Sequence, residues 1–342
     1  MVNGEQSMFK RLLQRLPCVS NQRRVWFYRD YEGFPGCHLK HAHYYQNTQA
    51  LSGYRAEVIF SRDAVSKTEC LERQTLWPQP SSAISEWLPE NQDVLFLAGL
   101  DWGYVLSQGG PALTLPKINL IQHVRHADKD TELYGFLANK AIRICVSQEV
   151  ADAILATGKV NGPVFAIPNG VDVPGLSNAE LDARCEVDTN QHRVLIVGYK
   201  MPALAGELSA ILQKRGIEHR LIDQLMDRQQ FLALLKEHSI VVCCPNFTEG
   251  FYLPALEVMA AGSLLVVPDC EGNRGFCVDR KTCIMPEYTP VQMAQSVEDA
   301  LCLPVLQRRQ LLQSAMEKVN EHSLGREREA FHNILKSVES LW

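Results

Sequence analysis

The chain has 342 residues and a formal net charge of −5, and 46% of its residues are hydrophobic while 21% are charged. Two α/β domains fit this length better than one, and the acidic balance provides no overall basic field for nucleic acid. With no apolar run of about 18 residues and no apolar core near residue 1, we expect neither a transmembrane helix nor a signal peptide.

The first half of the chain alternates short apolar runs with helical stretches. This alternation is typical of a parallel sheet that is covered by helices on both faces. A helix is expected over residues 37–51, and another over 148–156 with Ser147 as its N-cap. The strands are expected at residues 24–28, 57–60, 94–98, 118–121, 141–146 and 164–167.

The same alternation begins again after the turn signal Pro168-Asn169-Gly170 and a polar, weakly patterned segment over residues 174–189. Strands are expected at 194–197, near Leu221, at 240–244 and at 264–267. Helices are expected at 202–215, 227–237, 254–261, 291–301, 304–322 and 325–342. We therefore predict an α/β protein with two doubly wound domains, residues 1–173 and 174–324, and a final helix over 325–342.

The eleven cysteines are scattered and odd in number. They match neither a disulfide framework nor a zinc-binding spacing, so we expect reduced thiols that pack in the core of a cytoplasmic protein. Residues 8–16 form a short basic amphipathic stretch that is compatible with contact at the inner face of a membrane. A helix packed on the domain, or a frayed tail, is the favoured interpretation of that stretch.

The most specific motif is Glu249-Gly250-Phe251-Tyr252-Leu253-Pro254-Ala255-Leu256-Glu257, which follows the strand expected at 240–244. Pro254 suits the first turn of a helix, because its missing N–H costs nothing there. The backbone N–H groups from Gly250 to Leu253 should then face an anion at the helix N-terminus, and Gly250 lets the anion approach closely. Glu249 and Glu257 would bracket this anion and accept hydrogen bonds from sugar or ribose hydroxyls.

The string E-G-F-x-L-P-x-L-E-x-M-A-x-G from Glu249 to Gly262 resembles the E-x₇-E signature of retaining GT-B glycosyltransferases of the family-4 kind. Residues 144–150 (ICVSQEV) and 167–172 (IPNGVD) resemble two further motifs of that family. The resemblance implies a GT-B fold of two Rossmann-like domains, with the final helix at 325–342 packed back on the first domain. It also implies that Glu249 contacts the transferred sugar and that Glu257 binds the ribose. The amides of Phe251, Tyr252 and Leu253 would hold phosphate and sugar oxygens.

One position departs from the family pattern. Members carry an arginine after the first strand of the second domain and a lysine several residues later, whereas this chain has Tyr199 and Ala205. Lys200 is the only cation near by, so we assign it to the leaving diphosphate. Arg274, in the loop after the strand expected at 264–267, is the candidate for a second cation.

In the first domain, the resemblance implies a histidine after the fourth strand that reaches the donor sugar. His123 is best placed and His126 is second. The loop that ends at Gly36 corresponds to a glycine-rich loop of the family near the donor phosphates. We expect no metal site, because no Asp-x-Asp is suitably placed and the spacing of His38, His41 and His43 gives no clean ligand face.

The resemblance implies a metal-independent retaining glycosyltransferase without a cofactor that uses a UDP- or GDP-linked sugar. Its acceptor would be a glycan or a lipid-linked molecule, with surface polysaccharide or lipopolysaccharide synthesis as the usual setting. Two alternatives stay open: a GT-B-fold epimerase acting on a sugar nucleotide, and a donor-binding subunit without turnover. The tyrosine at position 199 is the feature that keeps the second alternative open.

Overall fold

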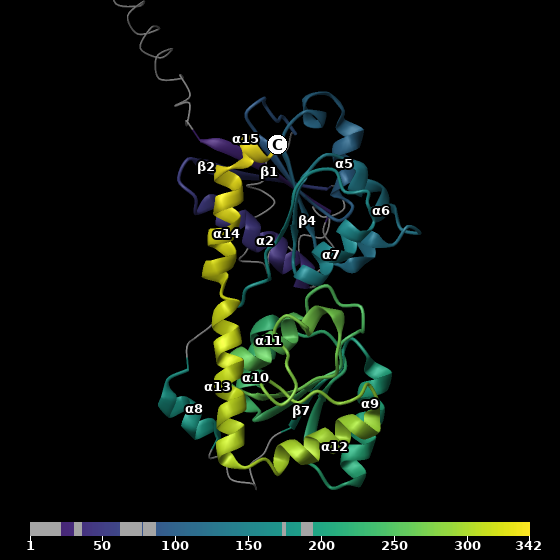
Figure 1. The fold of residues 1–342 in the computed structure, drawn as a ribbon, viewed down its shortest axis with the longest axis vertical. Helices are drawn as coiled ribbons and strands as arrows, with labels where there is room; N and C mark the ends of the chain where they lie inside the picture. Colours follow the sequence, from purple (N-terminus) through teal and green to yellow (C-terminus); the bar gives the residue numbers. More distant parts are fainter. Residues whose placement is uncertain (1–21, 31–35, 62–76, 78–86, 173–175, 186–193) are drawn as a thin grey trace, which may run out of the picture.

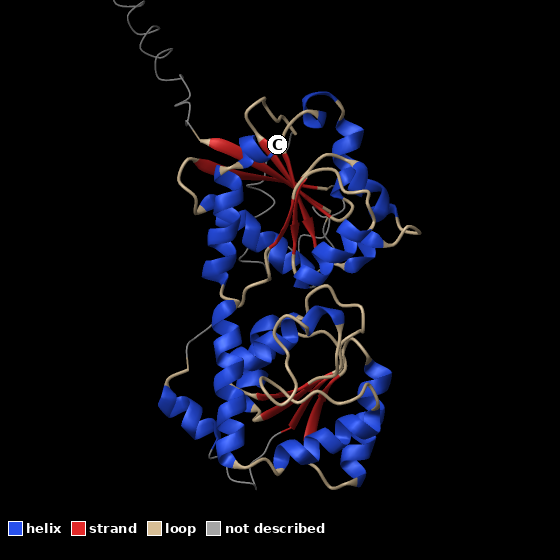
Figure 2. Ribbon diagram, in the orientation of Figure 1, coloured by secondary structure: helices blue, strands red, loops and turns tan. Residues whose placement is uncertain are grey.

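The computed structural model describes residues 22–30, 36–61, 77, 87–172, 176–185 and 194–342, and it contains two parallel sheets, each flanked by helices (Figure 2). The first sheet has the strand order β2-β1-β3-β4-β5-β6. Its strands are β1 (Arg23–Arg29), β2 (Tyr54–Phe60), β3 (Val94–Ala98), β4 (Lys117–Ile121), β5 (Ile142–Cys145) and β6 (Val164–Ala166). The central strands β3, β4 and β5 are buried along their whole length, as expected when helices cover both faces.

The helices of the first domain are α2 (Gly36–Gln49), α5 (Asp101–Gln108), α6 (Glu132–Gly135) and α7 (Gln148–Ala156). Short 3₁₀ turns lie at Gly110–Leu113, Val124–Ala127 and Phe136–Ala138. Ser147 caps α7 as expected, because its side chain accepts a hydrogen bond from the Val150 amide. The sequence pattern did not predict α5.

The second sheet has the order β10-β9-β7-β8, again parallel. Its strands are β7 (Val194–Val197), β8 (His219–Ile222), β9 (Ile240–Cys243) and β10 (Leu264–Val266). The helices around it are α8 (Asn178–Cys185), α9 (Pro202–Lys214), α10 (Arg228–Glu237), α11 (Leu253–Ala260), α12 (Pro290–Leu301) and α13 (Val305–Glu321), and a 3₁₀ turn lies at Glu271–Asn273.

Helix α8 lies in the polar, weakly patterned segment over residues 174–189, where the sequence pattern placed the domain boundary. The side chain of Glu180 accepts hydrogen bonds from both the amide (2.8 Å) and the hydroxyl (2.7 Å) of Ser177. Ser177 in turn accepts one from the Glu180 amide (3.2 Å), which completes a capping box. This S-x-x-E signature is readable in the sequence and could have predicted the helix.

The chain ends in α14 (Leu324–Lys336) and α15 (Val338–Leu341), two helices in place of the single one that the sequence suggested. Figure 1 shows α13 and α14 running one after the other along one side of both domains. Phe331 of α14 lies in the core of the first domain, edge-on to Tyr44 of α2 with ring centroids 4.8 Å apart. The C-terminal helices therefore belong to the core of the first domain, although they follow the second domain in sequence.

The helix α14 is also tied to the link between the domains by a buried ion pair. Lys40 on α2 lies 2.7 Å from Glu327, and both residues are nearly inaccessible to solvent. The amide of Gly170 donates to Glu327, and the carbonyl of Gly170 accepts from Lys40. A side chain at position 170 would collide with the Ser323 backbone, with the nearest atoms 2.6 Å from its Cβ. Glycine is therefore required where the two crossing segments meet.

Three other expectations concern the cysteines, membrane-spanning helices and the amphipathic stretch near residue 1. Of the cysteines that the structure describes, only Cys302 is exposed, and the others lie buried and unbridged. In the described part of the chain, no helix is both long and apolar enough to span a membrane. The amphipathic stretch at residues 8–16 lies outside the described residues.

Candidate active site

The order of strands reverses between β1 and β3 in the first sheet and between β7 and β9 in the second. Ligands of open α/β sheets bind at such switch points, outside the carboxyl ends of the strands. A cavity of about 670 Å³ lies there, lined by both domains. From the second domain it is lined by Tyr199, Lys200, Glu249, Gly250, Phe251, Tyr252, Leu253 and Pro254.

The loop before α11 presents fewer free amides than the sequence suggested. The Tyr252 amide donates to the Gly272 carbonyl at 2.8 Å, and the Leu253 amide donates to the Phe251 carbonyl at 3.1 Å. The expectation that both amides hold ligand oxygens is therefore corrected. The amides of Gly250 and Phe251 have no acceptor among the described residues, and they lie at the N-terminus of a helix where an anion is favoured.

Glu249 lies in the cleft beside Lys200. Among the described residues that line the cavity, Lys200 is the one cation from the second domain. The Oε1 atom of Glu249 accepts a hydrogen bond from Asn246 at 3.0 Å and lies 3.3 Å from Lys200 Nζ. No partner of Oε2 is described, so this oxygen can accept from a ligand hydroxyl. The structure thus brings together Glu249 and Lys200, two of the residues that the sequence selected for the site.

Gly250 is the point at which the two domains touch within the site. Its carbonyl accepts a hydrogen bond from the Ser147 hydroxyl of the first domain at 2.9 Å. A Cβ atom built on Gly250 would lie 2.1 Å from the Gln122 carbonyl oxygen, and 2.8 Å from the Cα atom of His123. Only glycine permits this approach, so the motif glycine serves domain contact as well as ligand access.

We expect Gly250→Ala to push the domains apart and to lower turnover at least tenfold, because the methyl group overlaps backbone atoms that cannot rotate away. The melting temperature of the second domain should change little. Steady-state rates and calorimetry measure the two effects. Gly275→Ala is the control, since a Cβ there meets nothing within 4 Å. Wild-type turnover in Gly250→Ala would contradict a closed, functional contact at this position.

Glu257 lies at a different place from the one expected. It is 4% exposed in the middle of α11, and its Oε1 atom lies 2.5 Å from Nη2 of Arg228 at the start of α10. Glu257 does not line the described cavity. In this structure the Glu257 carboxylate is paired with Arg228 and is not a free carboxylate. Arg228 was not expected at the site. It could have been selected from the sequence, because it follows the Asp227 N-cap in a loop between a strand and a helix.

The predictions for Arg274 and Gly36 receive no support. Arg274 is bound through two nitrogens to Asp269, at 3.0 and 2.6 Å, on the surface outside the cavity lining. In this structure Arg274 is thus paired with Asp269 and does not reach the cleft. Gly36 is the first residue of α2, and the loop before it at residues 31–35 lies outside the described part of the chain. Tyr199 is partly buried at the position of the family arginine, where burial and then the charge of Glu257 raise its pKa.

His123 lines the cleft opposite Glu249, at the carboxyl end of β4. Burial, followed by the charge of Arg125, lowers its pKa to about 4, so the imidazole is neutral at physiological pH. Its Nδ1 atom accepts a hydrogen bond from the Arg125 amide at 3.1 Å, which leaves the proton on Nε2. His123 can thus donate one hydrogen bond to a ligand. His126 also lines the cavity, and burial lowers its pKa to about 4 as well.

The described residues hold no group of three or more histidine, cysteine, aspartate or glutamate side chains arranged for a metal ion. His38 and His41 instead accept hydrogen bonds from Arg29.

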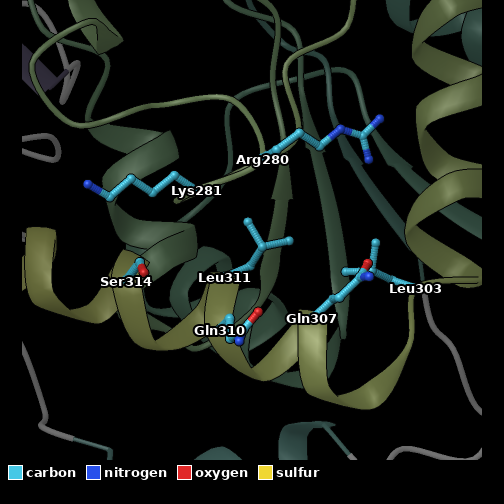
Figure 3. A pocket seen from close by; sticks show the side chains of 7 residues that line it. All are labelled: Arg280, Lys281, Leu303, Gln307, Gln310, Leu311 and Ser314. Atoms are coloured by element: carbon cyan, nitrogen blue, oxygen red, sulfur yellow. The ribbon is translucent and has the colours of Figure 1, made fainter.

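A second cavity of about 410 Å³ lies in the second domain, away from the cleft. Its two cations, Arg280 and Lys281, point in opposite directions and form no common site (Figure 3).

Residues 179–302 match the family model for glycosyl transferases group 1. The second domain is a group 1 glycosyltransferase domain. This match supports a glycosyltransferase, and the likeness to solved structures gives the chain as a whole the GT-B fold. No curated protein matches the sequence of the chain significantly.

Solved structures of this glycosyltransferase fold resemble the whole chain at low sequence identity. Sucrose-phosphate synthase from Thermosynechococcus elongatus is 11% identical with a TM-score of 0.67, over 93% of this chain and 100% of that one. Anabaena HepE in complex with UDP-glucose is 14% identical with a TM-score of 0.65, over 92% and 99%. Trehalose 6-phosphate synthase from Burkholderia multivorans is 11% identical with a TM-score of 0.58, over 93% and 97%. These likenesses establish the fold.

Proposed function

We propose that this glycosyltransferase moves a sugar from a UDP- or GDP-linked donor to a glycan or lipid-linked acceptor, with retention of the anomeric configuration. The observation that carries the proposal is the group formed by Lys200, Glu249 and the free amides of Gly250 and Phe251, with His123 on the opposite wall. The complex of the structurally similar HepE with UDP-glucose supports a donor of this class.

The proposed reaction breaks the bond between the anomeric carbon and the diphosphate. Negative charge builds on the leaving oxygen, where the Lys200 ammonium and the two amides stabilise it. Glu249 accepts hydrogen bonds from the sugar, and neutral His123 donates one. The departing phosphate takes the proton of the acceptor hydroxyl on the same face of the sugar, so no carboxylate nucleophile is assigned.

In this proposal the Lys200 ammonium and the two amides stabilise the negative charge on the leaving group. The reaction should therefore need no metal. Activity should survive an excess of EDTA at the level of an untreated sample. Loss of activity with EDTA that added magnesium or manganese restores would contradict metal independence.

The acceptor, the setting in surface polysaccharide or lipopolysaccharide synthesis, and the cytoplasmic location stay predictions. One structural feature favours a second function, a donor-binding subunit without turnover. Partly buried Tyr199 replaces a family cation, and Lys200 is the one cation from the second domain in the described cleft lining.

The decisive experiment is a panel of nucleotide sugars screened for a rise in melting temperature, followed by donor hydrolysis with the stabilising compound. A ligand at 100 times its Kd stabilises the folded state by about 2.7 kcal/mol, which is readily measured. NMR of the released or transferred sugar then reports its anomeric configuration. Binding without turnover would select the non-catalytic subunit, and an altered sugar nucleotide would select the epimerase.

For the donor site we expect Glu257→Ala to weaken nucleotide binding by about 1.5–3 kcal/mol, the range for a lost hydrogen bond to a charged group. Calorimetry with the stabilising nucleotide measures the change. Arg228 loses its partner in this variant but is 41% exposed, so solvent can hydrate it. Asp269→Ala breaks a comparable surface pair of Arg274 and serves as the control. An unchanged dissociation constant would remove Glu257 from the donor site.

A further inference from the structure

The second domain brings less positive charge to the proposed diphosphate site than the family pattern does. Tyr199 and Ala205 stand at the positions where the resembling enzymes carry an arginine and a lysine. Arg274 is paired with Asp269 outside the cavity lining. Lys200 is then the one cation that the second domain contributes to the described lining, whereas a departing nucleoside diphosphate carries several negative charges. A further cation would have to come from the opposite wall of the cleft.

The first-domain wall of the described cavity lining contains two arginines, Arg29 and Arg125. Arg29 is 5% exposed and donates hydrogen bonds to the ring nitrogens of His38 and His41. Its charge also acts on Asp101, where burial raises the pKa of the carboxyl to about 7 and Arg29 opposes that rise. Arg29 is therefore committed to groups of the protein, and Arg125 is the arginine of this wall that a ligand can reach.

Arg125 combines a fixed backbone with a free side chain. In the 3₁₀ turn at Val124–Ala127, its amide donates to His123 Nδ1 at 3.1 Å. Its carbonyl accepts from the Asp128 amide and from the Thr131 hydroxyl, both at 3.1 Å. The residue is exposed, and its guanidinium has no partner in the part of the chain that the structure describes. Its planar fork of N–H donors matches the oxygens of a phosphate.

The turn that carries Arg125 follows directly on the contact between the first domain and the anion-binding loop. A Cβ atom built on Gly250 would lie 2.8 Å from the Cα atom of His123. The Gly250 amide is one of the two amides of this loop without an acceptor among the described residues. Burial, followed by the charge of Arg125, lowers the pKa of His123 to about 4, and Glu249 and Lys200 act on the same imidazole. The free arginine and the diphosphate-binding groups therefore lie around one histidine.

We propose that Arg125 is a catalytic residue that contacts the leaving diphosphate from the first domain, as the second cation beside Lys200. The proposal rests on the glycosyltransferase function proposed above and adds a residue to the same site. When the bond between the anomeric carbon and the diphosphate oxygen breaks, the electron pair stays on that oxygen. The guanidinium donates hydrogen bonds to the phosphate as this charge builds. The acceptor proton still moves to the departing phosphate, so Arg125 stays protonated throughout.

A cation on this wall makes the phosphate site depend on both domains. The diphosphate would bridge Arg125 and Lys200, and it would favour the closed arrangement in which the Ser147 hydroxyl donates to the Gly250 carbonyl at 2.9 Å. The phosphate that leaves with the broken bond is the second phosphate of the nucleotide. A nucleoside monophosphate lacks this group, so its binding should not depend on Arg125.

Nucleotide binding without acceptor tests this contact directly. Calorimetry with UDP, UMP, GDP and GMP gives the dissociation constants of the wild type and its variants. We expect the preferred diphosphate to bind more tightly than its monophosphate. Arg125→Ala should weaken the diphosphate at least tenfold and the monophosphate less than twofold. Arg125→Lys keeps the charge without the fork and should recover part of the loss. Lys129→Ala removes an exposed cation outside the cavity lining, and this control should bind both nucleotides like the wild type.

Turnover provides the second readout. At saturating donor and acceptor, Arg125→Ala should lower kcat by about 10²-fold, the range for one lost group that stabilises transition-state charge. The melting temperature should stay at the wild-type value, because the side chain is exposed and makes no described ion pair. Lys129→Ala should keep the full rate.

Two results would overturn the role of Arg125 and leave the glycosyltransferase function standing. One is diphosphate affinity and kcat within twofold of the wild type in Arg125→Ala. The other is unchanged diphosphate affinity with a raised KM for the acceptor, which would place Arg125 on the acceptor instead. A wild-type protein that binds neither nucleoside diphosphates nor nucleotide sugars would contradict the glycosyltransferase function itself, and the proposal for Arg125 with it.

Discussion

Replacing Lys200 with alanine is expected to lower turnover by about 10²-fold or more, equivalent to about 2.7 kcal/mol of transition-state stabilisation. In the described cleft lining, Lys200 is the one cation from the second domain, and the histidines there are neutral because burial lowers their pKa values to about 4. From the second domain, the developing charge on the diphosphate would then be stabilised by the Gly250 and Phe251 amides without a cation.

The fold should tolerate this change. The Lys200 side chain is 39% exposed, and exposed ion pairs contribute at most about 1 kcal/mol. The measurement is the rate of nucleoside diphosphate release at saturating donor, with melting temperature as a check on folding. Lys200→Arg keeps the charge and should recover much of the rate. Arg274→Ala removes a surface arginine paired with Asp269 and should leave the rate unchanged.

A rate for Lys200→Ala within threefold of the wild type would show that Lys200 does not stabilise the leaving group. Arg228 would then be the next cation to test, because it lies near Tyr199, Glu257 and the first-domain helix α2.

The second large effect is expected from truncation after Leu324, which removes α14 and α15. Phe331, Ile334, Leu335 and Val338 of these helices are at most 5% exposed in the core of the first domain. Burial of each such side chain contributes about 1.5–3 kcal/mol, and whole domains are stable by only about 5–15 kcal/mol. The truncated first domain should therefore unfold or melt far below the intact protein, and turnover should be lost.

Nucleotide binding should suffer less than turnover, because the donor groups lie on the second domain. Calorimetry and thermal melts followed by circular dichroism separate these effects. The point variant Phe331→Ala should cost about 3–5 kcal/mol of stability, whereas Glu329→Ala on the exposed side of α14 should change it little. A truncated chain with the wild-type melting temperature would show that α14 does not stabilise the first domain.

Local patterns in the sequence were sufficient to predict most of the fold. Apolar runs of four to six residues, separated by amphipathic stretches, determine buried parallel strands and covering helices wherever they occur. The Pro254 turn, the Ser147 cap and the run from Ile240 depend only on neighbours in the chain, and the structure has them as expected. That Glu249 and Lys200 lie together at the cleft could likewise be predicted, because strand ends on both sides of a switch point converge.

Contacts between distant residues decided the rest. Whether an amide is free depends on its acceptor, and the carbonyl of Gly272 reaches Tyr252 only in the folded domain. Glu257 is paired with Arg228, 29 positions away, and Asp101 joins the cleft wall only when β1 and β3 lie side by side. Hydrogen bonds and burial of this kind depend on distances in space that no local pattern encodes. The sequence by itself therefore determined the elements and the strand-end loops, and the tertiary structure decided which of their groups are open to a ligand.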